Sequence, residues 1–404
     1  MLAQNRQAES IAMPRTLAVL CLLLIGAALL ATVPSVGAQT FTVLHSFGNG
    51  NDGAAPLAGL TLDRGGNLYG TTVLGGRQGV GTIFKWSTGS SIYSVLYNFD
   101  EEHGMLPRAQ MVFGPDGALY GTTQSGGIDG GYGVVFKAQP QSHPCPTVSC
   151  PWAVTVLHSF DGFDGFSPTN IAFDPAGNLY GVAQNTVYKL THGNGSWSYG
   201  RVDYVSDPVG LAIDANGNVF GFEGGDPGSA FEIGSSGQLQ YIYTFTNDTG
   251  TNPNTNPILD SAGNLYGQTL AGGVYLGGTV VELSPFGRGW SASVLNNFMS
   301  GNNNSQPGAP NLYMDAEGNI YGTVSQGGAY QYGEVFKLSP SSGGWTSTDL
   351  HDFCQAGYPN CSDGCYPFSN VVIDANGNLY GTTSSCGAFS SGEQSGGTLW
   401  KITP

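Results

Sequence analysis

The 404 residues carry 12 Lys and Arg against 28 Asp and Glu, a formal charge of −16, so the chain lacks the basic surface that nucleic acid binding requires. Charged residues make up only 10% of the sequence and Gly reaches 64 residues, which argues against a helical protein because Gly is costly inside helices. Apolar residues reach 40% and aromatic residues 11%, which excludes a disordered chain. Many short strands joined by tight turns fit this composition.

Residues 1–38 are typical of an export signal. Arg6 and Arg15 supply sparse positive charge, and an apolar run follows at residues 17–33. We expect cleavage after Ala38 and a secreted or periplasmic product that is not inserted in a membrane. The alternative is that the apolar run, about 17 residues long, is retained as a membrane anchor.

Seven copies of a short core follow, each reading D-x-x-G-N-L-Y-G or a close variant. The cores lie at residues 63–70, 116–121, 174–181, 214–221, 260–267, 315–322 and 374–381. The Asp-x-x-Gly-Asn letters predict a tight hairpin, because Asp bonds nearby backbone amides and Gly permits a positive φ. An apolar strand precedes each hairpin, and up to two more alternating strands follow the second one, so each unit predicts a four-stranded blade.

The order of strands at the two ends predicts a closed ring. A strand of the fourth type, residues 41–47, precedes the first core, and residues 400–402 form a strand of the third type with no fourth strand after it. The N-terminal strand can therefore complete the last blade, which removes the free edges of the sheet. We predict a single all-β domain over residues 39–404, a seven-bladed β-propeller of four-stranded blades closed by the N-terminal strand joining the last blade. We expect it to be a monomer.

These repeats resemble the GloVer (Gloeo/Verruco) tandem-repeat family of exported bacterial proteins, in which NLYGTT…GG…GTVFKL recurs. The resemblance covers residues 41–404 and implies propeller-like repeats without implying an activity. Members of that family commonly carry a C-terminal surface-sorting segment. Because this sequence stops at Pro404, directly after the last strand, we expect release rather than anchoring. The hairpin letters are also similar, more weakly, to those of NHL and lactonase-type propellers.

Six cysteines follow the export signal, and an even number in an exported chain predicts disulfides. They are Cys145, Cys150, Cys354, Cys361, Cys365 and Cys386. The first two flank a Pro-containing loop and are expected to pair with each other, whereas the last four permit three pairings. Zinc is the alternative for these four, although their spacing lacks two C-x-x-C units.

The motifs provide no catalytic site. His45, His158 and His351 occupy one repeat position that other units fill with Tyr or Asn, which indicates strand packing rather than catalysis. Residues 48–53 match G-x-G-x-x-G, but a strand follows them where a dinucleotide site needs a helix. The sequence has no G-x-S-x-G, H-E-x-x-H or P-loop pattern. We therefore predict no catalytic residue and no cofactor beyond a bound Ca²⁺.

The connections from the fourth strand of one unit to the first strand of the next are rich in Asp, Asn, Gly and Ser. Together with the Gly-Gly loops they are expected to share one face of the ring, where propellers generally carry their sites. Candidate ligand-binding residues on that face are Asp52, Asp161, Asp164, Asn247 and Asp248. Their oxygens could bind Ca²⁺; the alternative is that they only solvate the turns.

Aromatic residues of the same loops could stack on sugars, or be exposed without a role. They are Phe163, Phe166, Tyr275, Tyr330, Tyr332, Tyr358 and Phe389. The function predicted from the sequence is an extracytoplasmic repeat scaffold that binds a glycan or a surface protein through this face. The rival is a propeller enzyme, a lyase or hydrolase of polysaccharides or lactones, with a site assembled across blades, for example from a pair of loop carboxylates. A purely structural surface protein is a third alternative.

Overall fold

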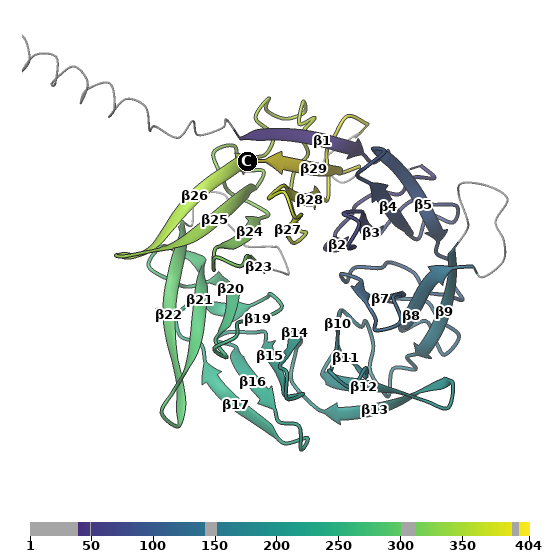
Figure 1. Ribbon diagram of the computed structural model, residues 1–404, viewed down its shortest axis with the longest axis horizontal. Coiled ribbons are helices and arrows are strands. Elements are labelled where there is room, and N and C mark those ends of the chain that lie inside the picture. The colour runs from purple at the N-terminus through teal and green to yellow at the C-terminus, as the bar shows by residue number, and fades with distance from the viewer. Residues whose placement is uncertain (1–38, 49, 142–151, 300–311, 390–395) are drawn as a thin grey trace, which may run out of the picture. The chain divides into compact units, whose positions relative to one another are not determined.

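The computed structural model describes residues 39–48, 50–141, 152–299, 312–389 and 396–404. The predicted signal peptide and the predicted pair Cys145–Cys150 lie outside these residues. Thr40–Thr403 form one compact unit, in which seven antiparallel sheets are arranged in a ring (Figure 1). The described residues form no helix, and so none long and apolar enough to cross a membrane. The predicted seven-bladed β-propeller is confirmed.

Each sheet is one blade, and the blades are numbered along the chain. Blade 1 holds β2 (Thr61–Leu62), β3 (Leu68–Thr72), β4 (Thr82–Ser87) and β5 (Ile92–Asn98). Blade 2 holds β6 (Val112–Phe113), β7 (Leu119–Thr123), β8 (Val134–Pro140) and β9 (Trp152–Ser159). Blade 3 holds β10 (Asn170–Phe173), β11 (Leu179–Ala183), β12 (Thr186–Gly193) and β13 (Ser196–Asp203).

Blade 4 holds β14 (Pro208–Ile213), β15 (Val219–Glu223), β16 (Ser229–Ile233) and β17 (Leu239–Thr244). Blade 5 has a first strand split into β18 (Thr251–Pro253) and β19 (Ile258–Leu259), followed by β20 (Leu265–Ala271), β21 (Leu276–Phe286) and β22 (Gly289–Met299). Blade 6 holds β23 (Tyr313–Met314), β24 (Ile320–Val324), β25 (Glu334–Ser341) and β26 (Gly344–Asp352). Blade 7 holds β27 (Val372–Ile373), β28 (Leu379–Thr383), β29 (Thr398–Thr403) and β1 (Thr40–Ser46). The first strand of each blade is the innermost (Figure 1).

The repeat hairpin is held by its Asp side chain. In blade 1, Asp63 Oδ1 accepts the backbone amides of Gly65 and Asn67, both at 2.8 Å, and Oδ2 accepts the Asn67 amide group at 2.9 Å and the Tyr69 hydroxyl at 3.2 Å. Burial alone would raise the pKa of Asp63, but these hydrogen bonds outweigh it and lower the pKa below its ordinary value. The same backbone contacts recur at Asp174, Asp214, Asp260, Asp315 and Asp374.

Blade 2 modifies this hairpin. Gly114 stands at the position of the Asp, and its amide donates to the Ala118 carbonyl as the Asp amides do elsewhere. Asp116, two residues later, binds the Tyr120 hydroxyl at 3.0 Å and the Lys137 ammonium at 2.6 Å. The carboxylate contact with the repeat Tyr is therefore preserved from a different position.

The Gly of the N-L-Y-G letters is required by a close approach. A Cβ on Gly70 would lie 2.5 Å from Phe84 Cζ, because the ring from β4 covers this glycine. The equivalent pairs are Gly121 with Phe136, Gly181 with Tyr188, Gly221 with Phe231, Gly322 with Phe336, and Gly381 with Trp400. In blade 5 the β21 position is Val281, and Phe222 of blade 4 supplies the ring over Gly267 instead.

At five blade interfaces of the described ring, a glycine of one blade meets a proline of the next. Gly81 of blade 1 has a φ of +113°, and a Cβ there would lie 2.8 Å from Pro107 Cδ of blade 2. The residue before that proline, Leu106, donates its amide to the Val80 carbonyl of blade 1 at 3.0 Å. The same pairing joins Gly133 to Pro168, Gly228 to Pro253, Gly333 to Pro367 and Gly397 to Pro56. The last of these links blade 7 to blade 1.

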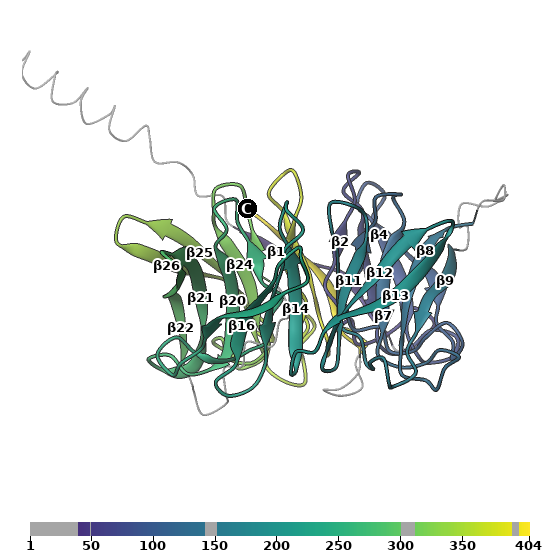
Figure 2. The same cartoon turned by 90° about the horizontal axis from the view of Figure 1, so that it is seen from below.

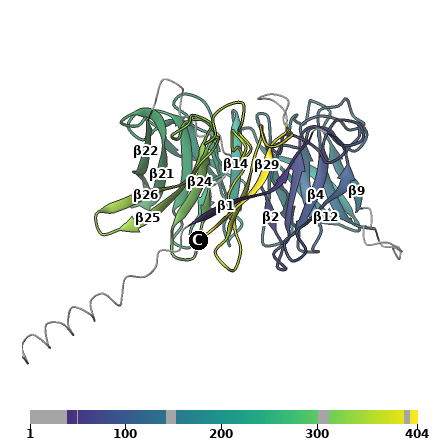
Figure 3. The same ribbon diagram turned by 90° about the horizontal axis from the view of Figure 1, so that it is seen from above.

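Blade 7 contains both ends of the compact unit. The strand β1 pairs antiparallel with β29, with Thr40 opposite Thr403 and Ser46 opposite Thr398 (Figures 1 and 3). The outermost strand of this blade therefore comes from the start of the chain, and the other three come from its last residues.

The connections between blades and the Gly-Gly loops lie on one side of the ring, which we call the loop face. In blade 1 the Ala54 amide donates to the Leu74 carbonyl at 2.8 Å, and the Gly76 amide donates to the Gly50 carbonyl at 2.9 Å. The Asp hairpins form the opposite side, the hairpin face. Figure 2 shows the blades from the edge, with the two sets of connections at opposite ends of the strands.

Candidate functional site

All seven blades contribute to one central cavity of about 470 Å³, which we call the axial cavity. Its walls are the innermost strands and the residues just before them. The lining residues are Leu60, Thr61, Leu62, Gln110, Val112, Asn170, Ile171, Leu211, Asn256, Pro257, Ile258, Leu312, Tyr313, Asn370, Val372 and Ile373. Because each blade presents the same strand to the axis, the repeat itself makes these side chains converge.

Carboxamide side chains form a collar around this cavity. They stand four residues before the repeat Asp position, near the loop-face end of the first strand. The collar consists of Gln110, Asn170, Asn256 and Asn370. Blades 1 and 4 have Gly59 and Gly210 at this position, and Asn311 of blade 6 lies outside the described residues.

The collar connects neighbouring blades. Asn370 Oδ1 accepts the Leu60 amide at 2.8 Å, and Gln110 Nε2 donates to the Leu60 carbonyl at 2.8 Å. On the other side of the ring, Asn170 Oδ1 accepts the Leu211 amide at 3.1 Å. The innermost strands have no strand partner on the axial side, so these side chains satisfy backbone groups that would otherwise lack hydrogen bonds.

The two glycines of the ring are needed for this arrangement. A Cβ on Gly59 would lie 2.6 Å from Asn370 Oδ1, and a Cβ on Gly210 would lie 1.8 Å from Asn256 Oδ1. Each glycine thus makes room for a carboxamide of a neighbouring blade. Gly59 and Gly210 interrupt the series of carboxamides in the sequence, and they provide the space that Asn370 and Asn256 occupy.

Below the collar the cavity is lined by aliphatic side chains and two hydroxyls. The Thr61 hydroxyl donates to the Met111 carbonyl. Burial, and to a lesser extent Asp315, raises the pKa of Tyr313, so its hydroxyl stays neutral at physiological pH. Among the described lining residues there is no carboxylate, Lys, Arg or His. The axial cavity offers hydrogen bonds and apolar contacts, without a group that could act as an acid or base near neutral pH.

The predicted loop residues fall in three separate connections on the loop face. Asp52 lies between blades 7 and 1, Asp161 and Asp164 between blades 2 and 3, and Asn247 and Asp248 between blades 4 and 5. The structure does not bring the three connections together as neighbours around the ring. That these residues bind a ligand stays a prediction.

Several of these side chains have structural partners. Asp161 Oδ1 accepts the amides of Phe163 and Asp164 at 2.8 and 3.0 Å, and these bonds lower the pKa of Asp161. The Asn247 carbonyl accepts the Gly273 amide at 2.6 Å. The side chains of Asn247 and Asp248 are exposed.

Asp52 and Asp164 hold histidines at blade interfaces. His45 Nε2 lies 3.3 Å from Asp52 Oδ2, and its ring stacks on Tyr93 of the next blade with 3.9 Å between ring centroids. Burial lowers the pKa of His45 more than Asp52 raises it. The same contact joins His158 to Asp164 and Tyr199, and His351 to Asp363 and Phe41. The three histidines therefore pack between blades, as their shared repeat position indicated.

Sequence reasoning missed an acidic cluster in blade 6. Ligand atoms of Glu334, Asp349 and Asp352 all lie within 4.8 Å of one another, and this is the one cluster of three or more potential metal ligands among the described residues. Burial and the two aspartates raise the pKa of Glu334 to about 7, and burial with Asp352 raises the pKa of Asp349 to about 6. Near neutral pH Glu334 is therefore only partly ionised.

Strand register gives the signal that could have found the cluster. Glu334 pairs with Asp352 at the position where Thr82 pairs with Asn98 in blade 1. Asp349, opposite Phe336, stands where Val95 faces Phe84. Three residues that are neutral in blade 1 are thus acidic in blade 6.

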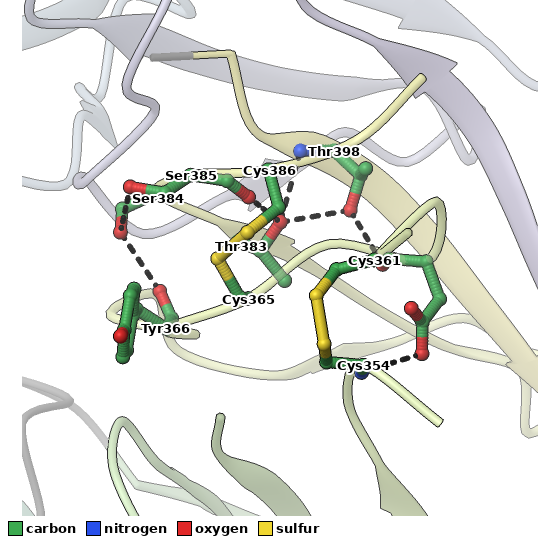
Figure 4. Close-up of a disulfide and its surroundings, with 10 residues drawn as sticks. Cys354, Cys361, Cys365, Tyr366, Thr383, Ser384, Ser385, Cys386 and Thr398 are labelled. Atoms are coloured by element: carbon green, nitrogen blue, oxygen red, sulfur yellow. Dashed lines mark hydrogen bonds between the residues drawn. A yellow bond between two sulfur atoms is a disulfide. The ribbon is translucent and has the colours of Figure 1, made fainter. Parts of the chain in front are cut away.

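The four C-terminal cysteines form two disulfides, which selects one of the three predicted pairings and removes the zinc alternative. Cys354 bonds Cys361, and Cys365 bonds Cys386 (Figure 4). All four cysteines are buried. The second disulfide joins the connection between blades 6 and 7 to the loop after β28, so it fixes part of the loop face.

The predicted stacking aromatics differ in exposure. Phe163 is 91% exposed, and Tyr332 stacks on Tyr358 with 6.4 Å between ring centroids. Exposed members of the set also include Tyr275, Tyr330, Tyr358 and Phe389. Phe166 contacts Tyr132 edge to face. They are spread over several loops of one face rather than gathered in one platform.

Solved structures share the propeller fold at low sequence identity. A streptogramin B lyase matches with a TM-score of 0.58 and 12% identity over 90% of this chain and 97% of that chain. Extracellular domains of two proteins of B. thetaiotaomicron, assigned as hybrid two-component systems, match with TM-scores of 0.53 and 0.56 and identities of 13% and 11%. They cover 90% and 89% of this chain but 41% and 39% of those chains. These likenesses show the fold alone.

No curated protein sequence matches the chain. The Gloeobacter/Verrucomicrobia repeat matches residues 32–222 and again residues 207–404. These two matches span the described ring from its first strand to its last. The chain therefore belongs to the Gloeobacter/Verrucomicrobia repeat family.

Proposed function

We propose that this protein is a non-catalytic extracytoplasmic binding protein, and that its axial cavity takes a neutral, polyhydroxylated ligand such as the end of a glycan. The observation that carries the proposal is the carboxamide collar above an uncharged cavity of about 470 Å³. Small-molecule sites typically measure roughly 300–1,000 Å³ and combine apolar walls with a few polar groups. The axial cavity has this composition.

The chemistry of the lining supports a neutral ligand. A carboxamide donates and accepts hydrogen bonds from one plane, as a pair of neighbouring sugar hydroxyls requires. Asn256 is the best placed member, because its side chain makes no hydrogen bond in the described structure and lies beside Gly210. The cavity has no charged side chain among its described residues to recognise an ionic ligand.

The disulfides support a location outside the cytoplasm. Disulfides persist in oxidising compartments and are rare in the cytosol, and the described chain has two. The extracellular-domain propellers similar to this chain agree with that location. Binding through the loop face, to a glycan or a surface protein, remains the alternative mode for the same class of function.

Titration of purified full-length protein with a panel of neutral oligosaccharides tests the proposal, with isothermal calorimetry as the readout. Asn256→Leu removes a collar carboxamide, and Val112→Phe fills part of the cavity. Asp161→Asn, on the loop face, is the matched control. We expect the first two variants to weaken binding at least tenfold and the control to bind as the native chain does.

The opposite pattern would reject the axial site. Loss of binding in Asp161→Asn with retention in Val112→Phe would assign the ligand to the loop face. Absence of binding to every neutral oligosaccharide would exclude a neutral glycan ligand.

The acidic cluster of blade 6 favours a second candidate, a hydrolase of polysaccharides. Glu334 lines a cavity of about 430 Å³ together with Asn296, Asn297 and Gln331. A carboxylic acid that is protonated near neutral pH beside a carboxylate is the pair that general acid–base hydrolysis uses. Release of reducing sugar from a polysaccharide by the native protein, abolished in Glu334→Gln, would establish this activity in place of a purely binding role.

A further inference from the structure

A second, larger hollow lies between blades 1 and 2, away from the axis. Its volume is about 760 Å³, and we call it the lateral groove. One wall is the face of β4 and β5 that looks toward blade 2, with Lys85, Ser94 and Tyr97. The other wall carries Trp152 at the start of β9, and Arg77 of the first Gly-Gly loop stands at the loop-face end.

At its outer strand, blade 2 lacks an aromatic residue that three other blades have. At the interface of blades 7 and 1, His45 stacks on Tyr93, which fills the space between the outer strands. The position of Tyr93, opposite Trp86 in blade 1, corresponds in blade 2 to Val154, opposite Ala138. Blade 3 has Tyr199 there and blade 7 has Phe41, and both stack on the histidine of the preceding blade. The ring that packs there at three other interfaces is therefore absent from blade 2. Blades 4, 5 and 6 also lack it, with Leu239, Ala292 and Ser347 at this position.

The floor of the groove carries an unneutralised cation. In blades 2 and 3 the lysines at the position of Lys85 pair with the hairpin Asp, Lys137 with Asp116 at 2.6 Å and Lys189 with Asp174 at 3.6 Å. Lys85, like those two lysines, lies over its repeat Tyr, 5.4 Å from the centroid of the Tyr69 ring. Unlike them, it makes no ion pair among the described residues.

The described residues around the groove give Lys85 no counterion. The oxygens of Asp63 are bonded to Asn67, Gly65 and Tyr69. The ammonium group of Lys85 is thus available to an anion from outside.

A second cation marks the other end of the groove. Arg77 is exposed, its backbone amide donates to Asn98 Oδ1 at 3.0 Å, and its guanidinium makes no ion pair in the described structure. The one carboxylate of the groove, Asp100, accepts the backbone amide of His103 and contacts its ring at 2.8 Å. The residues lining the groove therefore have a positive balance in a chain whose formal charge is −16.

Two half-buried rings complete the chemistry. Tyr97 and Trp152 both line the groove, and amphipathic rings of this kind give sugars an apolar surface with a polar edge. Burial, with smaller contributions from Asp100 and Glu102, raises the pKa of Tyr97 to about 12. Its hydroxyl is therefore a neutral hydrogen-bonding group, as are the Ser87 and Ser94 hydroxyls beside it.

We propose that the lateral groove binds a linear anionic oligosaccharide, with its sugar rings against Tyr97 and Trp152 and its acidic groups at Lys85 and Arg77. The six residues of β4 span roughly 20 Å at about 3.3 Å per residue, enough for several sugar units. At physiological salt, charges farther away than a Debye length of about 8 Å are largely screened. The charged groups beside the groove therefore have the largest effect on a bound anion. The site is independent of the axial cavity.

The test uses the full-length protein and three probes of equal length: an oligogalacturonate, a sulfated oligosaccharide and a neutral malto-oligosaccharide. Comparison of the first two distinguishes a carboxylate from a sulfate as the preferred acidic group. We expect the anionic probes to bind, the neutral probe to bind at least tenfold more weakly in the groove, and the affinity for anions to fall as salt rises.

Substitutions in the groove, one of them copied from another blade, and a control in blade 7 test whether the anion binds in the groove itself. Val154→Tyr copies the residue that blade 3 has at this position. Its ring should stack on the lining residue Tyr97, as Tyr199 stacks on His158, and so narrow the groove and weaken binding while thermal unfolding stays cooperative. Lys85→Gln and Arg77→Gln should each weaken binding about tenfold. Lys401→Gln changes the equivalent lysine of blade 7, which also lies over its repeat Tyr, and should leave binding unchanged.

Two results would overturn the proposal. Equal weakening by Lys85→Gln and Lys401→Gln would mean that anions are held by general charge, and full binding by Val154→Tyr would place them outside the groove. Asn256→Leu separates this proposal from the axial one, because it should leave anion binding intact whether or not the axial cavity has a ligand.

Discussion

Blades 1 and 6 are built on the same frame and differ at their outer strands. Both have the Asp hairpin, with Asp63 and Asp315 binding the repeat Tyr at 3.2 and 3.1 Å. At the third strand, blade 1 has Thr82, whose hydroxyl lies 2.8 Å from that of Thr72, whereas blade 6 has Glu334 within the acidic cluster. The inner strands of a blade therefore keep the repeat residues, whereas the outer strands differ between blades and can carry functional groups.

The largest expected effect is one that both blades share. Gly70→Ala and Gly322→Ala would each place a methyl group 2.5 Å from the Cζ of a buried ring, Phe84 or Phe336. Overpacking of this kind costs about 1–3 kcal/mol or more, and we expect about 3 kcal/mol in both blades from chemical denaturation. Gly89→Ala, where no atom lies within 4 Å of the new Cβ, is the control and should cost little. A large loss in only one blade would contradict a common frame.

The next effect should separate the two blades. The pKa of Glu334 is raised from 4.5 to about 7 in the folded protein, so the folded state holds this proton more tightly than the unfolded chain does. Native stability should therefore fall as the pH rises from about 4.5 to 7, and stay level above that. Glu334→Thr, which copies blade 1, should remove this loss and gain about 2 kcal/mol at pH 8 but little at pH 4.5.

Thermal unfolding of the variant and the native protein across this pH range measures the gain. The difference between the two proteins isolates Glu334 from histidines and other groups that titrate in the same range. Glu317→Gln removes an exposed carboxylate of the same blade and should show no pH-dependent gain. A constant difference between Glu334→Thr and the native chain at all pH values would show that repulsion in the cluster is not the cause.

The smallest effect belongs to blade 1 alone. Thr82→Val removes the hydroxyl pair with Thr72 at nearly constant volume. Thr72 keeps a hydrogen bond to the Leu74 carbonyl at 3.0 Å, so no buried group loses its last partner. We expect a loss of about 1 kcal/mol in chemical denaturation. A loss above that of Gly70→Ala would mean that the hydroxyl pair, and not the ring over the glycine, holds the outer half of the blade.

The fold could be predicted from the sequence because its contacts are local and repeated. In six blades the hairpin Asp bonds residues two and four positions ahead, and in blade 2 Asp116 binds the repeat Tyr from a shifted position, so each copy of the motif specifies its own hairpin. The order of strand types at the chain ends then specified which blade is shared. Nothing in this reasoning required a long-range contact.

The candidate site could not be predicted in the same way. Asn370 and Leu60 meet across 310 positions of sequence, and the collar appears only when the innermost strands are superposed. The acidic cluster of blade 6 is a departure from the repeat, and Val154 stands where three other blades have an aromatic residue. Both features are visible only once strand register assigns each residue an equivalent. The predicted loop carboxylates were chosen for their composition, and several are used to hold turns and histidines.

The pairing of β1 with β29 has a mechanical consequence. Thr40 lies directly opposite Thr403, so a pull applied to these two residues loads the first hydrogen-bonded pair of the ladder before the others. The bonds would then break one after another, as in unzipping, rather than all at once as in shear. Force between the two ends should peel β1 from blade 7 at low load and open the ring there, while the Gly–Pro contacts between the other blades stay unloaded. A propeller of this kind tethered at both ends would give way first at this strand.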